Sequence, residues 1–145
     1  MTIVDAMWFR ILLPSMLIFM AAPAFASDQA DIESLISRYA AARDTLSPDK
    51  AAIESLFLQD ADQLVSSGIW RRGRDELVRG MMRSSRNNGD DRKIEVEAVR
   101  LVMDDVAVVD TRYVIGERKM WSTFVVLKSD EGWRIAAIRN MKPVE

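Results

Sequence analysis

The order of patterns along the chain predicts an α+β fold, in which helices pack on one face of a mostly antiparallel sheet. Helical periodicity prevails between residues 31 and 86, and alternating or β-branched runs prevail after residue 91. A run of helices followed by a run of strands is typical of this class. The later runs are separated by only two to four residues, as in hairpins. We therefore predict about three N-terminal helices, a strand threaded between them, and a meander of four longer strands.

Three segments have the character of helices. The first, residues 31–43, has apolar residues at the spacing of one helical face: Ile32, Leu35, Ile36 and Tyr39. Ser47 and Pro48 suit a helix N-cap and the first helical position. The short helix that follows is expected to bury Ala52, Ile53, Leu56 and Phe57. The third helix, residues 74–86, has an apolar side, and its other side carries arginines that we interpret as a solvated face.

Five segments have the character of strands. Residues 61–70 form the first, which is interrupted near Gly68, and residues 87–91 form a turn by composition. The later strands are expected at 92–102, 106–115, 119–128 and 133–140. Alternation in the last of them places four residues on one face: Trp133, Ile135, Ala137 and Arg139. This row predicts that Arg139 faces the same side of the sheet as the core.

The first 26 residues have the layout of a cleavable secretory signal. An apolar run at 11–22 precedes the small-residue pattern Ala24-Phe25-Ala26. The run is shorter than the roughly 20 residues that span a bilayer, which argues against an uncleaved anchor. We therefore expect residues 1–26 to be a signal peptide and residues 27–145 to be one domain. The protein would be periplasmic or secreted, with no membrane association after cleavage.

The composition excludes several kinds of site. The chain contains no histidine and no cysteine, and its net charge is −2. The absence of histidine removes the usual general base and the commonest zinc ligand. The carboxylate pairs Asp104/Asp105 and Asp130/Glu131 lie in predicted turns and not in a converging cluster. We therefore expect no metal, no cofactor and no nucleic-acid partner.

Two short motifs have alternative interpretations. Ser47 and Lys50 have the Ser-x-x-Lys spacing of penicillin-interacting serine enzymes, but the companion motifs are absent from the sequence. The arginine-rich stretch 70–74 has the look of a phosphate or nucleic-acid patch, and we interpret it as a loop with solvated charges.

Four stretches together resemble the SnoaL-like branch of the ketosteroid isomerase and nuclear transport factor 2-like superfamily. They are "SRYAAAR", "AAIESLFLQDADQLVSSGIW", "GRDELVRGM" and "STFVVLKSDEGWRIAAIRN". The resemblance implies a cone-shaped barrel, in which a curved, mostly antiparallel sheet wraps on about three N-terminal helices and leaves a mostly apolar pocket. It also implies a homodimer through the outer face of the sheet.

The resemblance also implies roles for individual positions. Tyr39 corresponds to the oxyanion-hole tyrosine of the isomerases. Their catalytic aspartate would fall at Val65 and their second carboxylic acid near Thr123, and neither position holds a carboxyl group. Arg139 stands where many relatives have a histidine. Because proton transfer between carbon atoms needs a positioned base, these departures favour binding over catalysis.

The resulting hypothesis is a non-catalytic pocket for a small, largely apolar molecule, which could carry an acidic group such as a carboxylate. Its expected lining residues are Tyr39, Gln63, Trp70, Tyr113, Trp121, Thr123 and Arg139. Two alternatives stay open. One is a cyclase, isomerase or hydratase that acts on a polyketide- or steroid-like substrate with Tyr39 as hydrogen-bond donor. The other is a protein-interaction module that uses the open sheet face.

Overall fold

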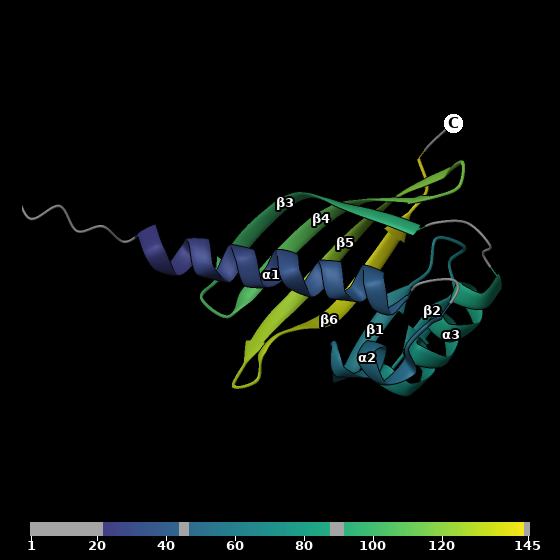
Figure 1. The fold of residues 1–145 in the computed structure, drawn as a ribbon, viewed down its shortest axis with the longest axis horizontal. Helices are drawn as coiled ribbons and strands as arrows, with labels where there is room; N and C mark the ends of the chain where they lie inside the picture. Colours follow the sequence, from purple (N-terminus) through teal and green to yellow (C-terminus); the bar gives the residue numbers. More distant parts are fainter. Residues whose placement is uncertain (1–21, 44–46, 88–91, 144–145) are drawn as a thin grey trace, which may run out of the picture.

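A long N-terminal helix crosses the inner face of a curved six-stranded sheet, and two shorter helices lie at one end of it (Figure 1). The computed structural model describes residues 22–43, 47–87 and 92–143. The helices are α1 (Ala22–Ala42), α2 (Lys50–Ser55) and α3 (Arg74–Asn87). The strands are β1 (Phe57–Leu64), β2 (Trp70–Arg72), β3 (Arg92–Met103), β4 (Val106–Ile115), β5 (Arg118–Ser129) and β6 (Gly132–Met141). The predicted α+β class is confirmed.

The sheet has the order β2-β1-β6-β5-β4-β3. The predicted meander is confirmed as β3 to β6, in which successive strands pair antiparallel. The exception to antiparallel pairing in this sheet is β1, which lies parallel to β6. The short strand β2 and the strand β3 form its two edges, so the described sheet is curved but open and does not close into a barrel.

The predicted apolar stripe of α1 lies in the core. Ile32, Leu35, Ile36 and Tyr39 are all almost completely buried. The sheet faces them with its own inward row: Ala107, Val109, Phe124, Val126, Ile135 and Ile138. The ring of Tyr39 packs edge-on against Phe124 and Phe57, with centroids 5.3 and 5.9 Å apart. These contacts hold the C-terminal half of α1 against the sheet.

Helix α2 begins two residues later than the sequence predicts. Its N-cap is Asp49, whose side chain accepts a hydrogen bond of 2.9 Å from the backbone of Ala52. The predicted cap at Ser47 is therefore wrong. An aspartate caps a helix as well as a serine does, so the residue types left this choice open. The expected burial of Ile53, Leu56 and Phe57 is confirmed.

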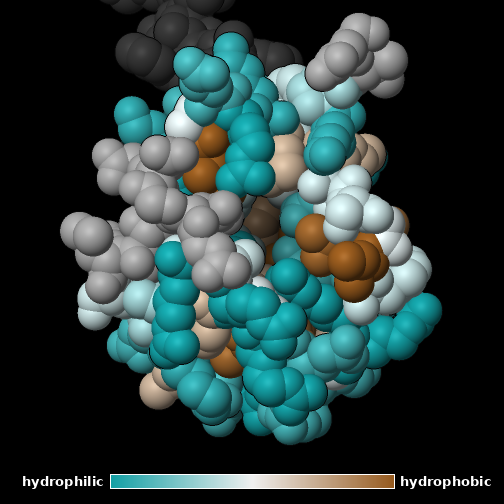
Figure 2. Space-filling model, turned by 90° about the vertical axis from the view of Figure 1, so that its right-hand side faces the viewer, coloured by the Kyte–Doolittle hydropathy of each residue, from teal (hydrophilic) through white to brown (hydrophobic). Residues whose placement is uncertain are grey.

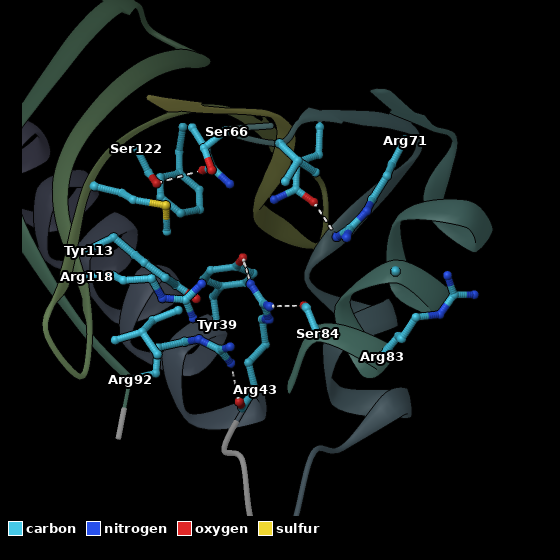
Figure 3. A pocket seen from close by; sticks show the side chains of 17 residues that line it. Tyr39, Arg43, Ser66, Arg71, Arg83, Ser84, Arg92, Tyr113, Arg118 and Ser122 are labelled. Carbon is cyan, nitrogen blue, oxygen red and sulfur yellow. Dashed lines mark hydrogen bonds between the residues drawn. The ribbon is translucent and has the colours of Figure 1, made fainter. Parts of the chain in front are cut away.

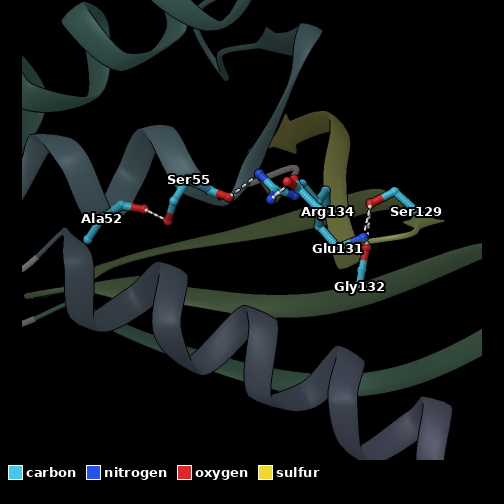
Figure 4. Close-up of polar contacts among 6 residues, drawn as sticks. All are labelled: Ala52, Ser55, Ser129, Glu131, Gly132 and Arg134. Carbon is cyan, nitrogen blue, oxygen red and sulfur yellow. Dashed lines mark hydrogen bonds and ion pairs between the residues drawn. The ribbon is translucent and has the colours of Figure 1, made fainter.

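Arg134 on β6 links α2 to the sheet (Figure 4). Its guanidinium donates to the backbone oxygen of Ser55, 2.7 Å away, and pairs with Glu131. Ser129 stabilises the turn before β6, because its hydroxyl donates to the backbone oxygen of Gly132 at 3.0 Å. These bonds fix where α2 ends and β1 starts.

A β-bulge interrupts the alternation of β6. Val126 of β5 pairs with Ile135, but the adjacent Val125 pairs with Ala137, which leaves Ala136 as an extra residue. A bulge of this kind reverses which side chains face inward beyond it. Ile138 is accordingly buried, and Arg139 points to the other side.

The predicted signal peptide lies partly outside the described residues, as does most of the predicted turn at 87–91. Helix α1 starts at Ala22, four residues before the end of the predicted signal. Phe25, Ala26 and Ser27 are exposed there. None of the helices in the described part of the chain is long and apolar enough to cross a membrane.

Candidate functional site

A cavity of about 350 Å³ lies between the C-terminal half of α1, helix α3 and one end of the sheet. At that end β4 and β6 finish and β5 begins. Figure 2 views the end of the molecule that is on the right in Figure 1, and its surface there is mainly hydrophilic around a central hollow. This volume is at the lower end of the range for pockets that hold small organic molecules.

Arginine is the dominant residue type around this cavity. Five arginines line it, and they come from five different elements or their ends: Arg43, Arg71, Arg83, Arg92 and Arg118. Figure 3 shows Arg43, Arg92 and Arg118 near Tyr39, whereas the guanidinium of Arg83 points away from them. Among the described residues that line the cavity, none is an aspartate or a glutamate. We call Arg43, Arg71 and Arg92 the arginine cluster.

Arg43 is the most deeply placed member of the arginine cluster. It is 5% exposed and directly follows α1, four residues after Tyr39 and therefore on the same face. Its guanidinium donates to the hydroxyl of Tyr39 at 2.6 Å and to that of Ser84 at 2.8 Å. Its Nε atom is buried without a hydrogen-bond partner in the described structure. A charge in this position is held by two neutral hydroxyls.

Arg92, the first residue of β3, lies next to Arg43. Its Nη1 donates to the backbone oxygen of Arg43 at 2.6 Å and to the hydroxyl of Ser85 at 3.1 Å. Its guanidinium lies 5.7 Å from the centre of the Tyr113 ring. Its Nε and Nη2 atoms are buried and have no partner at good hydrogen-bond geometry within the described ranges, although the Tyr113 hydroxyl lies near enough to interact with this guanidinium.

Arg71 reaches the cavity from the short edge strand β2. Its Nη1 donates to the side-chain oxygen of Gln63 at 3.0 Å. The side chain lies across Gly80 of α3, where a Cβ atom would be 2.3 Å from Arg71 Nε. Glycine costs helix stability, and here it provides the space that the arginine needs.

The members of the arginine cluster oppose one another electrostatically. Burial lowers the pKa of both Arg71 and Arg92, and the positive charge of Arg43 lowers the pKa of both further. Burial also opposes the charge of Arg43, and its pKa is still raised by coulombic attraction to Tyr39 and Tyr113, an attraction that acts only when a tyrosine is ionised. At neutral pH the two hydroxyls are uncharged and do not neutralise Arg43. Arginine nevertheless stays protonated in proteins. The cavity therefore concentrates positive charge that a bound anion would neutralise.

The cavity also has an apolar wall and further hydroxyl groups. Ile115, Met120 and Phe124 line it from the sheet. Ser122 donates a hydrogen bond of 2.7 Å to Asn140. Burial raises the pKa of Tyr113, so its hydroxyl keeps its proton at neutral pH and can donate it. No three His, Cys, Asp or Glu side chains gather as they would around a metal ion in the part of the chain that the structure describes.

The structure places three of the seven sequence-predicted site residues around this cavity. They are Tyr39, Gln63 and Tyr113. Gln63 is only 2% exposed and orients Arg71 through the hydrogen bond described above. Their contact with a ligand stays a prediction.

The other four predicted site residues lie away from the cavity. Trp70 and Trp121 are 39% and 44% exposed, and Thr123 donates to Asp110 at 2.8 Å. The prediction that Arg139 faces the cavity is wrong, because the bulge in β6 turns it to the outer face of the sheet. There it forms an ion pair with Asp62 at 2.7 Å and lies 4.8 Å from the centre of the Trp70 ring.

Sequence reasoning missed the arginines that define the site. A signal for Arg43 was present, since it extends the buried helical face of Ile32, Ile36 and Tyr39 by one turn. Arg92 likewise shares strand alternation with Ile94 and Val96. Arg71 belongs to the arginine-rich stretch 70–74, which is predicted from the sequence to be a loop with solvated charges. That interpretation is wrong for Arg71, whose partly buried side chain lies across Gly80 and lines the cavity.

Comparison with solved structures shows the same fold in several bacterial proteins. A domain of unknown function with a cystatin-like fold from Nostoc punctiforme has a TM-score of 0.69 and 22% identity, with 82% of this chain and 79% of that chain covered. An NTF2-like protein of unknown function from Silicibacter pomeroyi has a TM-score of 0.68 and 18% identity, with 82% of this chain and 98% of that chain covered. A protein of Streptomyces avermitilis that is described as a "putative dehydratase from the NTF2-like family" has a TM-score of 0.69 and 14% identity, with 83% of this chain and 99% of that chain covered.

At these identities the likeness establishes the NTF2-like, cystatin-like fold alone. No curated protein matches the sequence significantly. The sequence model of one family does match, over residues 27–138, and that family is described as "putative lumazine-binding". The match covers most of the chain, including most of α1 and of the sheet and all of the arginine cluster. The chain therefore belongs to this lumazine-binding-like family within the NTF2-like fold.

Proposed function

We propose that this protein binds a small organic anion in the arginine-lined cavity and does not transform it. The observation that carries the proposal is the guanidinium of Arg43, which is buried at the cavity without a carboxylate partner among the described residues. A buried charge without a counter-charge costs several kcal/mol. A ligand that supplies the negative charge would recover much of that cost.

The cavity supports an acidic ligand more strongly than a largely apolar one. Its apolar wall is limited to a few side chains of the sheet and to Val65, which follows β1, whereas arginines enter from several sides. Arginine is suited to anions because its planar fork of N–H groups matches the oxygens of a carboxylate or a phosphate. The apolar wall then contacts the organic part of the ligand.

Binding without chemistry is supported by the lack of a suitable base. The chain has no histidine, and the described lining of the cavity has no carboxylate. Tyr113 holds its proton tightly, because burial raises its pKa. These groups can donate hydrogen bonds to an anion but have no evident means of removing a proton from carbon.

The narrower SnoaL-like assignment also stays a proposal, supported by the order of the matching segments.

The proposal is tested by native mass spectrometry of the protein purified from its own cells, followed by calorimetric titration with small anions. We expect a retained negatively charged ligand, or binding of at least one aromatic carboxylate or phosphate at micromolar to millimolar Kd. Uncharged analogues, such as benzamide, should bind at least tenfold more weakly. Equal binding of benzamide and benzoate, or no binding of any anion at 0.15 M salt, would refute the proposal.

Export to the periplasm or out of the cell is a further part of the proposal. It is supported by the sequence features of residues 1–26 and by the family match, which starts at Ser27. Cleavage after Ala26 would remove the exposed residues Phe25 and Ala26 from α1, and the first buried core residue in the described part of this helix is Ile32. N-terminal sequencing of protein from the fractionated cells should give Ser-Asp-Gln. A sequence that starts at Met1 would contradict the cleavage.

A further inference from the structure

The arginine cluster has more hydrogen-bond donors than the described residues satisfy. Three buried nitrogen atoms at the cavity have no partner among the described residues: Arg43 Nε, Arg92 Nε and Arg92 Nη2. A fourth such atom, Arg74 Nε, belongs to a residue outside the cavity lining. Buried donors are nearly always paired in native proteins, and each unpaired one costs about 1–3 kcal/mol. The unpaired donors show that the guanidinium groups of Arg43 and Arg92 are incompletely satisfied within the described structure, and the cavity is the open space that these two side chains line.

The hydroxyl groups near these nitrogens add to the same site. Tyr39 accepts a hydrogen bond from Arg43, so its own hydroxyl hydrogen, for which the described residues provide no acceptor, can point to a ligand. Tyr113 stays protonated and lies beside Arg92. Figure 3 shows the side chains of Tyr39, Arg43, Arg92 and Tyr113 converging on one region of the cavity. The region offers N–H and O–H donors from several directions.

We infer that the anionic group is the dianion of a phosphate monoester, an inference that rests on the proposed function. A carboxylate has one negative charge and two oxygens in one plane, and a single guanidinium can satisfy both. The arginine cluster brings three mutually repelling cations to the cavity, so a single negative charge leaves two of them unneutralised. A phosphate monoester has about two negative charges at pH 7 and three terminal oxygens in a tetrahedral arrangement, which can accept from all of these directions.

The size of the cavity indicates that the phosphate carries an organic group. A volume of about 350 Å³ corresponds to roughly a dozen water molecules at about 30 Å³ each, more than a phosphate group alone displaces. Ile115, Met120 and Phe124 provide an apolar wall next to the polar region. The ligand class is thus a phosphate monoester of a compact, partly apolar alcohol or phenol.

A set of probes with the same ring tests the charge and shape of the anionic group. Calorimetry at pH 7.5 and 0.15 M salt would compare phenyl phosphate, benzenesulfonate, benzoate and phthalate, with inorganic phosphate as the probe without an organic part. We expect phenyl phosphate to bind at least tenfold more tightly than each of the others. Its affinity should fall at pH 5, where the dianion has taken up one proton and become a monoanion, and that of benzenesulfonate should not.

A pair of variants tests whether the arginine cluster is responsible. Arg92→Gln should weaken phenyl phosphate at least tenfold and benzoate much less, because it removes a charge and two unpaired donors. Arg79→Gln removes the same charge from the exposed side of α3, outside the cavity lining, and should leave both affinities unchanged. Circular dichroism would verify that both variants are folded, and Arg92→Lys would replace Arg92→Gln if the latter does not fold.

The outcomes separate this inference from the proposed function. If benzoate or phthalate binds as tightly as phenyl phosphate, the phosphate inference is overturned and anion binding stands. If inorganic phosphate matches phenyl phosphate, the organic part has no role and the ligand class is wrong. If Arg79→Gln weakens binding as much as Arg92→Gln does, the effect is one of overall charge and the site is refuted. If none of the probes binds, both proposals fail.

Discussion

Replacing Arg43 by methionine should weaken anion binding about 100-fold and leave the protein at least as stable as the wild type. Arg43 supplies the most buried charge at the cavity, and among the described residues its guanidinium donates to the hydroxyls of Tyr39 and Ser84. Loss of a charged hydrogen-bond donor should raise the Kd for the anion about 100-fold, which is about 3 kcal/mol. Isothermal titration calorimetry with phenyl phosphate or benzoate measures this effect.

Stability should respond in the opposite direction, because the cost of burying the charge disappears with it. Methionine fills similar space, and substitution of buried charged groups by apolar residues is often neutral or stabilising by about 1–4 kcal/mol. Removal of Arg43 also relieves its repulsion with Arg71 and Arg92. Ser84 keeps a partner, since its hydroxyl donates to the backbone oxygen of Met81 at 3.1 Å. Chemical denaturation without ligand measures the free energy of unfolding.

Two control variants make this result specific to Arg43. Arg79→Met removes a charge from the exposed side of α3 and should change neither affinity nor stability appreciably. Arg43→Lys keeps the charge but loses the planar fork, so it should retain only part of the affinity. A large loss of stability in Arg43→Met together with unchanged anion binding would show that Arg43 is a structural residue.

Most of the fold could be predicted from the sequence because local patterns and tertiary packing agree over long segments. The four meander strands were expected within one or two residues of their observed ends, since alternation and short turns both specify them. The first strand was placed less well. It begins at Phe57, which the helical pattern of the preceding segment had assigned to a helix face. Helical and strand periodicity are hard to separate over such short runs.

The site was predicted less well than the fold, and Arg139 shows why. Strict alternation from Trp133 places Arg139 inward, but one extra residue at Ala136 reverses the face. Neither Ala136 nor its neighbours are glycines, the residue type that most often indicates a bulge in a sequence. For Arg43 the sequence pattern was correct, because helical periodicity places this residue on the buried face of α1. It was not predicted as a site residue because arginines are usually solvated.

Replacing Gly80 by alanine should weaken anion binding about tenfold or more without a matching loss of stability. The added Cβ would lie 2.3 Å from Arg71 Nε and 2.5 Å from its Cζ, so the guanidinium must leave its present position. Displacement of Arg71 breaks its hydrogen bond with Gln63, which contributes about 1 kcal/mol to stability. Alanine stabilises the helix by about 1 kcal/mol relative to glycine, so the two effects nearly cancel. The unfolding free energy should therefore stay within about 1 kcal/mol of the wild type.

A double-mutant cycle shows whether Gly80 acts through Arg71. Arg71→Gln alone should weaken anion binding by a similar factor, because it removes the same cation from the cavity. Two residues that act through one group are not additive, so the double variant should bind no more weakly than Arg71→Gln alone. If Gly80→Ala instead lowers the affinity equally in both backgrounds, it disturbs α3 itself and not the position of Arg71. The cycle thus separates a glycine that positions a ligand-binding arginine from one that merely affects helix packing.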